Sequence, residues 1–241
     1  MNAKAVFFDV DFTLIYPGPT FRGEGYQAFC ARYGMDVDPA RFTDAVASAA
    51  PLLDGPDDAP YAPEIFVAYT RHIIEGIGGR GPGLDACARE IYEEWAACQH
   101  FELYEEVPEV LRALTSAGIR IGLISNTHRC LASFQSHFEL QGLISATVSS
   151  SDHGLMKPHP SIFAAALQLI GADAADAVMV GDSMRQDVEG ALRAGMKAVL
   201  LQRSSGPPPP RAVELGVPVV HSLRALPAAL VGDRSVTSSR R

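Results

Sequence analysis

Short apolar segments alternate with helix-like segments throughout the second half of the chain, from Glu105 onward. The apolar segments have the length and composition of strands, and they span residues 119–125, 146–151, 177–182, 197–201 and 218–220. Helical patterns surround them, near residues 107–117, 128–138, 160–170, 183–195 and 223–231. Strands that alternate with helices predict an α/β protein with a parallel sheet covered on both faces. The handedness of such crossover connections favours a doubly wound sheet.

One more strand is expected near the N-terminus, where the apolar run from Ala5 to Phe8 ends abruptly in Asp9 and Asp11. Burying a charge is costly unless another group compensates it. Two acids one residue apart at the tip of a strand therefore predict a bound cation, a proton-transfer role or both. On an extended segment, residues two apart share a face, so both carboxylates can approach one ligand.

Polar residues end other predicted strands in the same way. Ser125 and Asn126 end one strand, and Asp182 ends another. Lys157 lies in a loop before a helix, in a chain that contains only three lysines among its 20 basic residues. Because ligands of open parallel sheets bind at the carboxyl ends of the strands, we expect all of these residues to meet the two acids of the first strand.

Residues 20–104 have a different, mostly helical pattern. Glycine- and proline-rich turns separate helical segments near residues 21–34, 39–50, 61–77 and 84–100. Such a stretch predicts a small helical bundle of its own. We therefore divide the chain into a core of residues 1–16 and 105–232, a helical domain of residues 17–104 and a flexible tail of residues 233–241.

Composition and charge disfavour several classes of function. The chain of 241 residues carries a net charge of −8, so we expect no binding to nucleic acid. No run of about 18 or more apolar residues occurs, which predicts no membrane span, and the N-terminus lacks the layout of a signal peptide. The four cysteines are scattered without the paired spacing of a zinc site, which indicates reduced thiols and a cytoplasmic protein.

Four segments together resemble the haloacid dehalogenase-like superfamily of phosphohydrolases: AVFFDVDFTL at 5–14, LISNT at 123–127, GLMKPHPSIF at 154–163 and VMVGDSMRQD at 178–187. The resemblance covers most of the chain. It implies a Rossmann-like catalytic core and a phosphatase that acts on a phosphomonoester.

The resemblance also assigns roles to individual residues. Asp9 matches the nucleophile that attacks phosphorus and forms an aspartyl-phosphate, and a carboxylate needs no base to activate it at neutral pH. Asp11 matches the general acid and base that protonates the leaving oxygen and then activates water. Ser125, Asn126 and Lys157 match the residues that hold the transferred phosphate, with Lys157 supplying a positive point charge. The helix that follows Asn126 is expected to point its N-terminus at the anion.

The implied cofactor is Mg²⁺, which prefers hard oxygen ligands. The expected ligands are the Asp9 carboxylate, the backbone carbonyl of Val10 and the Asp182 carboxylate. Asp187 is expected to support the metal site. Asp11 belongs to the same metal-binding motif, with its side chain left free for proton transfer.

The first motif departs from the usual pattern, because Phe12 stands where a glycine is common. Phenylalanine adopts the positive φ of a tight turn only at a cost, so either the turn accepts it or its ring packs against the helical domain. Several alternatives stay open besides the phosphatase: a phosphomutase of the same fold, a 2-haloacid dehalogenase and a non-catalytic binding protein. Asp11 disfavours the dehalogenase, whose reaction needs no proton on a leaving oxygen.

The helical domain resembles the cap that family members carry after the first strand. Such a cap closes over the site and excludes water, with residues 16–20 and 105–108 as candidate hinges. A large cap favours small phosphorylated metabolites as substrates. Polar or aromatic residues that could contact the substrate are Arg22, Tyr26, Arg71, His72, Trp95 and His100. The sequence leaves open whether the protein is a monomer or a homodimer.

Overall fold

The computed structural model describes residues 3–58 and 60–230, which include a six-stranded parallel sheet. Its strands are β1 (Ala5–Phe8), β4 (Arg120–Ser125), β5 (Ala146–Ser149), β6 (Ala177–Gly181), β7 (Lys197–Leu201) and β8 (Val219–Val220). Their order across the sheet is β5-β4-β1-β6-β7-β8, and all neighbours are parallel. The chain builds outward from β1 to β5 and then returns to the other side of β1. The predicted α/β fold with a doubly wound sheet is therefore confirmed.

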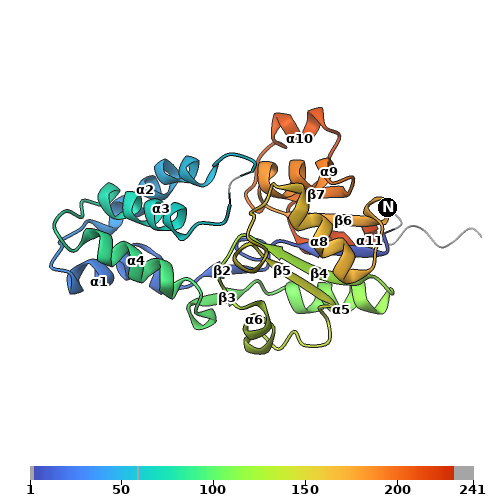
Figure 1. The fold of residues 1–241 in the computed structure, drawn as a ribbon, viewed down its shortest axis with the longest axis horizontal. Helices are drawn as coiled ribbons and strands as arrows, with labels where there is room; N and C mark the ends of the chain where they lie inside the picture. The colour runs from blue at the N-terminus through green and yellow to red at the C-terminus, as the bar shows by residue number, and fades with distance from the viewer. Residues whose placement is uncertain (1–2, 59, 231–241) are drawn as a thin grey trace, which may run out of the picture.

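Each face of the sheet has its own hydrophobic cluster, because side chains alternate along every strand. Val6 and Phe8 of β1 belong to one cluster, and Ala5 and Phe7 belong to the other. The first face is covered by α5 (Val107–Ser116), α6 (Leu131–His137) and α11 (Leu226–Leu230). The second is covered by α8 (Pro160–Ile170), α9 (Gly190–Arg193) and α10 (Pro210–Glu214). Figure 1 shows α5 and α6 on one side of the strands and α8, α9 and α10 on the other.

Four helices lie together at one end of the molecule, away from the sheet (Figure 1). They are α1 (Gly23–Arg32), α2 (Phe42–Ala49), α3 (Pro63–Gly76) and α4 (Leu84–Glu94). The chain enters them through β2 (Ile15–Pro17) and leaves through β3 (Phe101–Leu103), and these two strands pair in an antiparallel ribbon. We call residues 18–100, between the two strands, the helical insertion.

Short helices complete the described secondary structure. The 3₁₀ helices are Pro19–Phe21, Pro39–Arg41, Ala50–Leu53, Cys98–His100, Ala174–Asp176 and Leu223–Ala225. One α-helical turn, α7, spans Ser150–His153, and a π-helix spans Met184–Glu189. No helix among the described residues is both long enough and apolar enough to cross a membrane.

Some expected boundaries were wrong. The helix expected at 84–100 ends at Glu94, and the ribbon strands β2 and β3 were not predicted. The strand expected at 146–151 ends at Ser149, whose side chain caps the following turn by accepting a hydrogen bond from the Asp152 N–H. The helix expected at 183–195 begins as the π-helix and only then becomes α9. The predicted tail at 233–241 lies outside the described residues.

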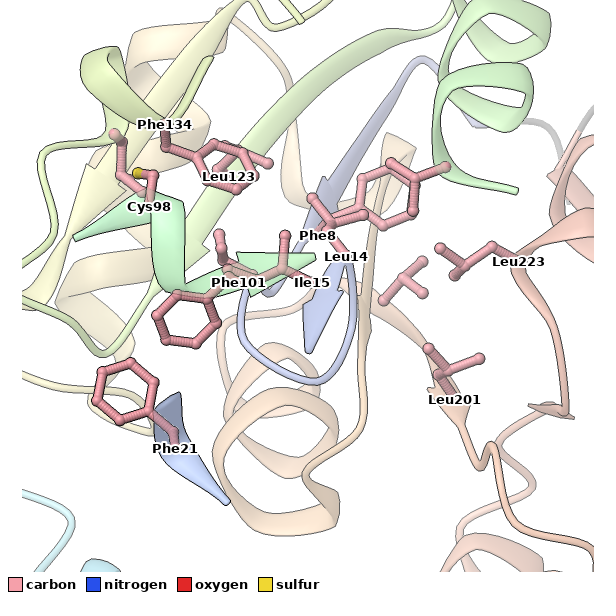
Figure 2. Close-up of a cluster of buried hydrophobic side chains, with 14 of the residues drawn as sticks. Phe8, Leu14, Ile15, Phe21, Cys98, Phe101, Leu123, Phe134, Leu201 and Leu223 are labelled. Carbon is pink, nitrogen blue, oxygen red and sulfur yellow. The ribbon is translucent and has the colours of Figure 1, made fainter. Parts of the chain in front are cut away.

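One hydrophobic cluster runs continuously from the sheet into the helical insertion. Figure 2 shows Phe8 and Leu201 of the sheet on one side of Leu14 and Ile15, with Phe101 and Phe21 on the other. Leu14 and Ile15 are fully buried. The ribbon that leads to the insertion is therefore packed into the core rather than exposed as a loose linker.

Candidate active site

The carboxyl ends of β1, β4 and β6 lie beside one another in the sheet, and the acids that follow β1 and β6 meet there. Asp9 follows β1, Asp182 follows β6, and Asp187 comes from the π-helix. One carboxylate oxygen from each lies within 4.8 Å of the other two. Within residues 3–58 and 60–230, these acids form the group whose spacing fits a metal ion.

Lys157 lies among these acids with its side chain only 1% exposed. Its Nζ donates to Asp9 Oδ1 and Asp187 Oδ1, both at 2.6 Å, and to the Ile124 carbonyl at 2.9 Å. An ammonium has three donors, so all of its hydrogen-bonding capacity is used. One positive charge against three carboxylates leaves two negative charges uncompensated when all three acids are ionised.

The π-helix brings Asp187 into this group. Its first widened turn closes with a hydrogen bond from the Val188 N–H to the Ser183 carbonyl, five residues back. Asp187 Oδ2 then accepts from the Ser183 N–H at 3.0 Å. Gly181 leaves room for the carboxylate, since a Cβ at that position would lie 2.1 Å from Asp187 Oδ2. Both oxygens of Asp187 are thus bound by the protein itself, which makes it an anchor for Lys157.

Asn126 fixes the loop that carries Lys157. Its Oδ1 accepts from the Lys157 N–H at 2.7 Å, and its Nδ2 donates to the Lys157 carbonyl at 2.9 Å. Nδ2 also donates to Gln186 at 3.2 Å. The amide expected to donate to phosphate is therefore committed to the protein. The following helix, α6, begins at Leu131, three residues later than the expected start at 128.

Burial and crowded negative charge set the pKa values of this group. Burial raises the pKa of Asp9, helped by Asp187 and Asp182 and opposed by Lys157. Burial and Asp187 raise the pKa of Asp182 to about 7. Asp182 is open to water where it lines the pocket, so solvent screening moderates this shift. Burial alone would lower the pKa of Lys157, but Asp187 and Asp9 outweigh it and raise that pKa.

Asp11 does not join the acidic group but pairs with a buried arginine. The Arg129 side chain is 0% exposed, and its Nη1 donates to both Asp11 oxygens, at 3.0 and 3.1 Å. Its Nη2 donates to the Trp95 carbonyl at 2.7 Å, just beyond the end of α4. The guanidinium lies 4.3 Å from the ring centre of Phe101 in β3. Arg129 thus connects Asp11 directly to the helical insertion and its ribbon.

The turn after β1 holds Phe12 at a φ of 63°, the conformation in which glycine is common. Arg203 supports this turn by donating to the Phe12 carbonyl at 3.3 Å and the Thr13 carbonyl at 2.7 Å. The Phe12 ring lies 6.5 Å from that of Trp95, so both sequence expectations about Phe12 apply. The Val10 carbonyl accepts the N–H groups of Leu14 and Ile15, at 2.8 and 3.1 Å, which disfavours it as a metal ligand.

A cavity of about 400 Å³ lies between the strand ends and the helical insertion. Its core wall carries the polar residues Asp9, Asp11, Ser125, Asn126, Asp182 and Asp187. Its insertion wall carries mostly aromatic and aliphatic residues: Tyr26, Ile65, Phe66, Tyr69, Tyr92 and Trp95. Lys157 does not line the cavity and reaches it through Asp9.

Only two of the six expected substrate contacts of the insertion line this cavity, namely Tyr26 and Trp95. The other four have partners elsewhere. Arg71 pairs with Glu75 and Asp85, and Arg22 donates to the Pro17 carbonyl. His72 bonds to Ser48, and His100 bonds to Thr20 and Glu94.

Sequence reasoning missed Arg129, Arg203 and Gln186 as parts of the site. Arg129 is the most consequential, because it holds both oxygens of Asp11. Its position three residues after Asn126 gave a hint, but arginines are rarely buried and the sequence shows no burial. Arg203 follows β7, a strand for which no ligand was expected.

The chain belongs to the haloacid dehalogenase-like hydrolases, whose family profile matches residues 3–195. This confirms the family that its four segments resemble, and the chain is an enzyme of the phosphatase type. Among similar proteins, N-acylneuraminate-9-phosphatase of Rattus norvegicus is 32% identical over 243 aligned residues, which cover 95% of this chain and 94% of that protein.

Two further comparisons agree on the family and the fold. Ribulose-1,5-bisphosphate 5-phosphatase of Halopiger xanaduensis is 28% identical and covers 84% of this chain and 86% of its own length. The crystal structure of a putative β-phosphoglucomutase from Thermotoga maritima superimposes with a TM-score of 0.69 at 18% identity, covering 95% of this chain and 98% of that chain. At that identity the structural likeness shows the fold alone.

Proposed function

We propose that the protein is a Mg²⁺-dependent phosphatase that hydrolyses a small phosphomonoester through an aspartyl-phosphate on Asp9. The observation that carries this proposal is the three-carboxylate group around Lys157, beside Asp11, at the floor of a cavity. The names of two similar proteins, a 9-phosphatase and a 5-phosphatase, support the same class of reaction.

The donor set fits a magnesium ion. Carboxylate oxygens are the ligands that Mg²⁺ prefers, and the two uncompensated negative charges of the group match its charge. Asp9 and Asp182 would hold the ion, with Asp187 buried behind them. The backbone carbonyl of Asp11 would supply the remaining oxygen of the motif, because the Val10 carbonyl is occupied within the turn, and the Asp11 side chain is kept for proton transfer. When bound, the ion would polarise the phosphoryl oxygens and neutralise their charge.

The reaction proceeds in two displacements at phosphorus. A carboxylate oxygen of Asp9 forms a bond to phosphorus while the bond from phosphorus to the alcohol oxygen breaks, and Asp11 gives that oxygen a proton. Asp11 then takes a proton from water, whose oxygen attacks phosphorus and releases inorganic phosphate and the Asp9 carboxylate. Lys157 orients Asp9 throughout, since its ammonium lies 2.6 Å from Oδ1. Ser125, which ends β4 and lines the cavity, donates to a phosphoryl oxygen.

The helical insertion is proposed to act as the cap of this site. Its aromatic residues form the wall of the cavity opposite the strand ends, where they would shield the transferred group from water. The domain boundaries of the proposal remain residues 17–104 for the cap and 1–16 with 105–232 for the core. The proposed hinge at 16–20 begins within β2, and the proposed hinge at 105–108 runs from the segment after β3 into the first turn of α5.

Phosphate release from a panel of small phosphomonoesters tests the proposal, with Mg²⁺ and with EDTA. We expect metal-dependent release by the native protein and none by Asp9→Asn. Asp173→Asn is the matched control, because Asp173 is exposed before β6, at the opposite end of that strand from Asp182. Release that persists in Asp9→Asn would overturn the aspartyl-phosphate, and an isomeric phosphate ester in place of free phosphate would identify a mutase.

A further inference from the structure

We propose that the alcohol half of the substrate is uncharged and apolar, carrying an aromatic or aliphatic ring. This inference rests on the proposed phosphatase function and adds the chemical class of the leaving group. It follows from the contrast between the two walls of the cavity: the core wall is charged, and the insertion wall is built of rings and aliphatic chains.

The cavity offers no fixed positive charge to an anionic leaving group. Among the described residues that line it there is no lysine or arginine, whereas five aspartates do so: Asp9, Asp11, Asp54, Asp182 and Asp187. Arg185 lies 3.8 Å from Asp54 at the insertion side, but Asp57 and the Gly55 carbonyl also bind it. Burial lowers the pKa of His128, which therefore stays neutral near pH 7.

A carboxylate or second phosphate on the alcohol half would thus be desolvated beside like charges. Burying a charge without a partner is unfavourable, and repulsion by the aspartates adds to that penalty. The transferred phosphoryl group does not meet this penalty, because Lys157 and the proposed metal supply positive charge at the strand ends, where that group binds. The penalty therefore falls only on charge placed at the insertion side.

The aromatic residues form a continuous surface from the insertion to the phosphate end. The ring of Phe66 stacks on that of Tyr92, with centres 6.1 Å apart and planes 23° apart. Tyr92 stacks in turn on His128, at 4.1 Å and 25°. His128 lies two residues after Asn126 in the loop that follows β4. A ring of the substrate that packs on Phe66 or Tyr92 would therefore extend from the phosphate along this surface.

Of the three tyrosines that line the cavity, Tyr26 and Tyr92 use their hydroxyls in hydrogen bonds within the protein, which disfavours a polyhydroxylated alcohol. Among the described lining residues, the Tyr69 hydroxyl and His128 Nε2 are left to bind a polar group of the substrate. The Tyr92 and Tyr61 hydroxyls bond to each other, and the Tyr26 hydroxyl bonds to Thr70. Gln186 Oε1 accepts from Asn126 Nδ2, and Gln186 Nε2 donates to the Leu53 carbonyl. A sugar would bury several hydroxyls against this wall and find few partners for them.

A matched pair of esters tests the inference: 2-phenylethyl phosphate and 2-(4-carboxyphenyl)ethyl phosphate. Both release a primary alcohol, and they differ chiefly in one remote negative charge. We expect kcat/KM with Mg²⁺ to be at least tenfold higher for the uncharged ester. Glucose 6-phosphate and N-acetylneuraminate 9-phosphate extend the panel, and we expect both to be poorer than 2-phenylethyl phosphate.

A charge added to the insertion wall makes the test specific to the pocket. Phe66→Arg should lower the ratio of kcat/KM for the uncharged ester to that for the carboxylated ester at least tenfold, because the arginine supplies a cation that can pair with the carboxylate. Leu169→Arg is the control: it adds the same charge at an α8 residue that is 63% exposed and does not line the cavity, and it should leave the preference unchanged.

The outcomes separate this inference from the proposed function. Faster turnover of the carboxylated ester or of either sugar phosphate overturns the inference and leaves the phosphatase intact. If no ester releases phosphate, the proposed function fails, and calorimetric binding of the matched pair to the native protein then decides the inference. Equal binding of the two esters overturns it, and tighter binding of the uncharged ester supports it.

Discussion

The two walls of the cavity differ in chemistry: charged, hydrogen-bonded side chains form the core wall, and aromatic side chains form most of the insertion wall. On the core wall, Asp9 and Asp187 each accept a hydrogen bond at 2.6 Å from Lys157, which is buried behind them. On the insertion wall, Phe66 and Trp95 contribute ring surface rather than charge. This difference agrees with the proposed function, in which the strand ends act on phosphorus and the insertion contacts the alcohol.

Besides the shared hydrophobic cluster, two kinds of polar contact connect the two regions. Arg129 is fully buried and joins Asp11 to the Trp95 carbonyl. Arg185 and Arg193 instead reach from the core to Asp57 at the surface, where their side chains are 32% and 43% exposed. Exposed ion pairs contribute about 0–1 kcal/mol each, so the buried contact is expected to dominate the coupling.

The largest effect is expected from removing the positive charge that is buried behind the core wall. Lys157→Met leaves the carboxylates of Asp9 and Asp187 buried without their partner. Breaking a buried ion pair costs about 3–5 kcal/mol of folding stability. Because Lys157 orients the proposed nucleophile Asp9, we expect kcat to fall by about 10²–10³, the range for a lost electrostatic contact.

Unfolding by urea and phosphate release measure the two effects of Lys157→Met. Lys197→Met is the control, because Lys197 begins β7 at the opposite end of the sheet from the site. A Lys157→Met protein with native kcat would contradict the assignment of chemistry to this wall.

The second effect concerns the buried contact between the walls. Arg129→Met removes the donor to both Asp11 oxygens and to the Trp95 carbonyl. We expect stability to fall by about 3–5 kcal/mol, as for other buried pairs that lose one partner. We expect kcat to fall more than KM rises, because Asp11 loses its orientation while the phosphate contacts remain.

Arg129→Lys keeps the charge but replaces the planar guanidinium, which here donates in two directions, with a point charge. It provides a milder variant if Arg129→Met does not fold. If Arg129→Lys changes only stability and leaves both kcat and KM unaltered, Arg129 is structural and does not position Asp11.

The contrast between the walls also explains what the sequence could predict. The core site was predictable because each strand end is marked by a polar residue after an apolar run, as with Asp9 and Asp182, and parallel strands bring their ends together. The insertion wall was not, because Phe66 and Tyr92 look like ordinary helix core residues. Arg129 was missed because its role depends on burial and on a carbonyl 34 residues away.

The third effect is a pH dependence of the folding stability, which we expect to differ with and without magnesium. The pKa values of Asp9 and Asp182 are raised in the folded protein without metal, that of Asp182 to about 7. A carboxyl whose pKa is raised by folding stabilises the fold at low pH, and that contribution is lost as pH rises through the folded pKa. We therefore expect the stability of the metal-free protein to fall between about pH 4 and pH 7.

Magnesium should reverse this loss, because it binds the ionised carboxylates. At a concentration about 100 times its Kd, a ligand adds about 2.7 kcal/mol. Protons compete with the metal at lower pH, so the increase in Tm on adding Mg²⁺ should be larger at pH 8 than at pH 6. Thermal unfolding with Mg²⁺ or EDTA at both pH values checks this, and an equal increase at both would exclude metal binding through these acids.

The smallest effect is expected at Phe12, the residue where the two walls approach each other. Its φ of 63° costs about 1–2 kcal/mol for a residue with a side chain. Phe12→Gly removes that strain but adds about 0.5–1 kcal/mol of chain entropy and loses the ring near Trp95. These terms nearly cancel, so we expect stability within about 1 kcal/mol of the native protein and an unchanged kcat for a small ester with no ring.

Phe12→Ala separates the backbone from the ring. Alanine also lacks the ring but keeps the strain, so it should be less stable than Phe12→Gly by about 1 kcal/mol in urea unfolding. Because Arg203 holds the carbonyls of Phe12 and Thr13 in every variant, the turn itself should persist. If the alanine variant is as stable as the glycine variant or more stable, residue 12 does not keep its positive φ in solution. The contact of Phe12 with Trp95 would then depend on the ring and not on the backbone conformation of the turn.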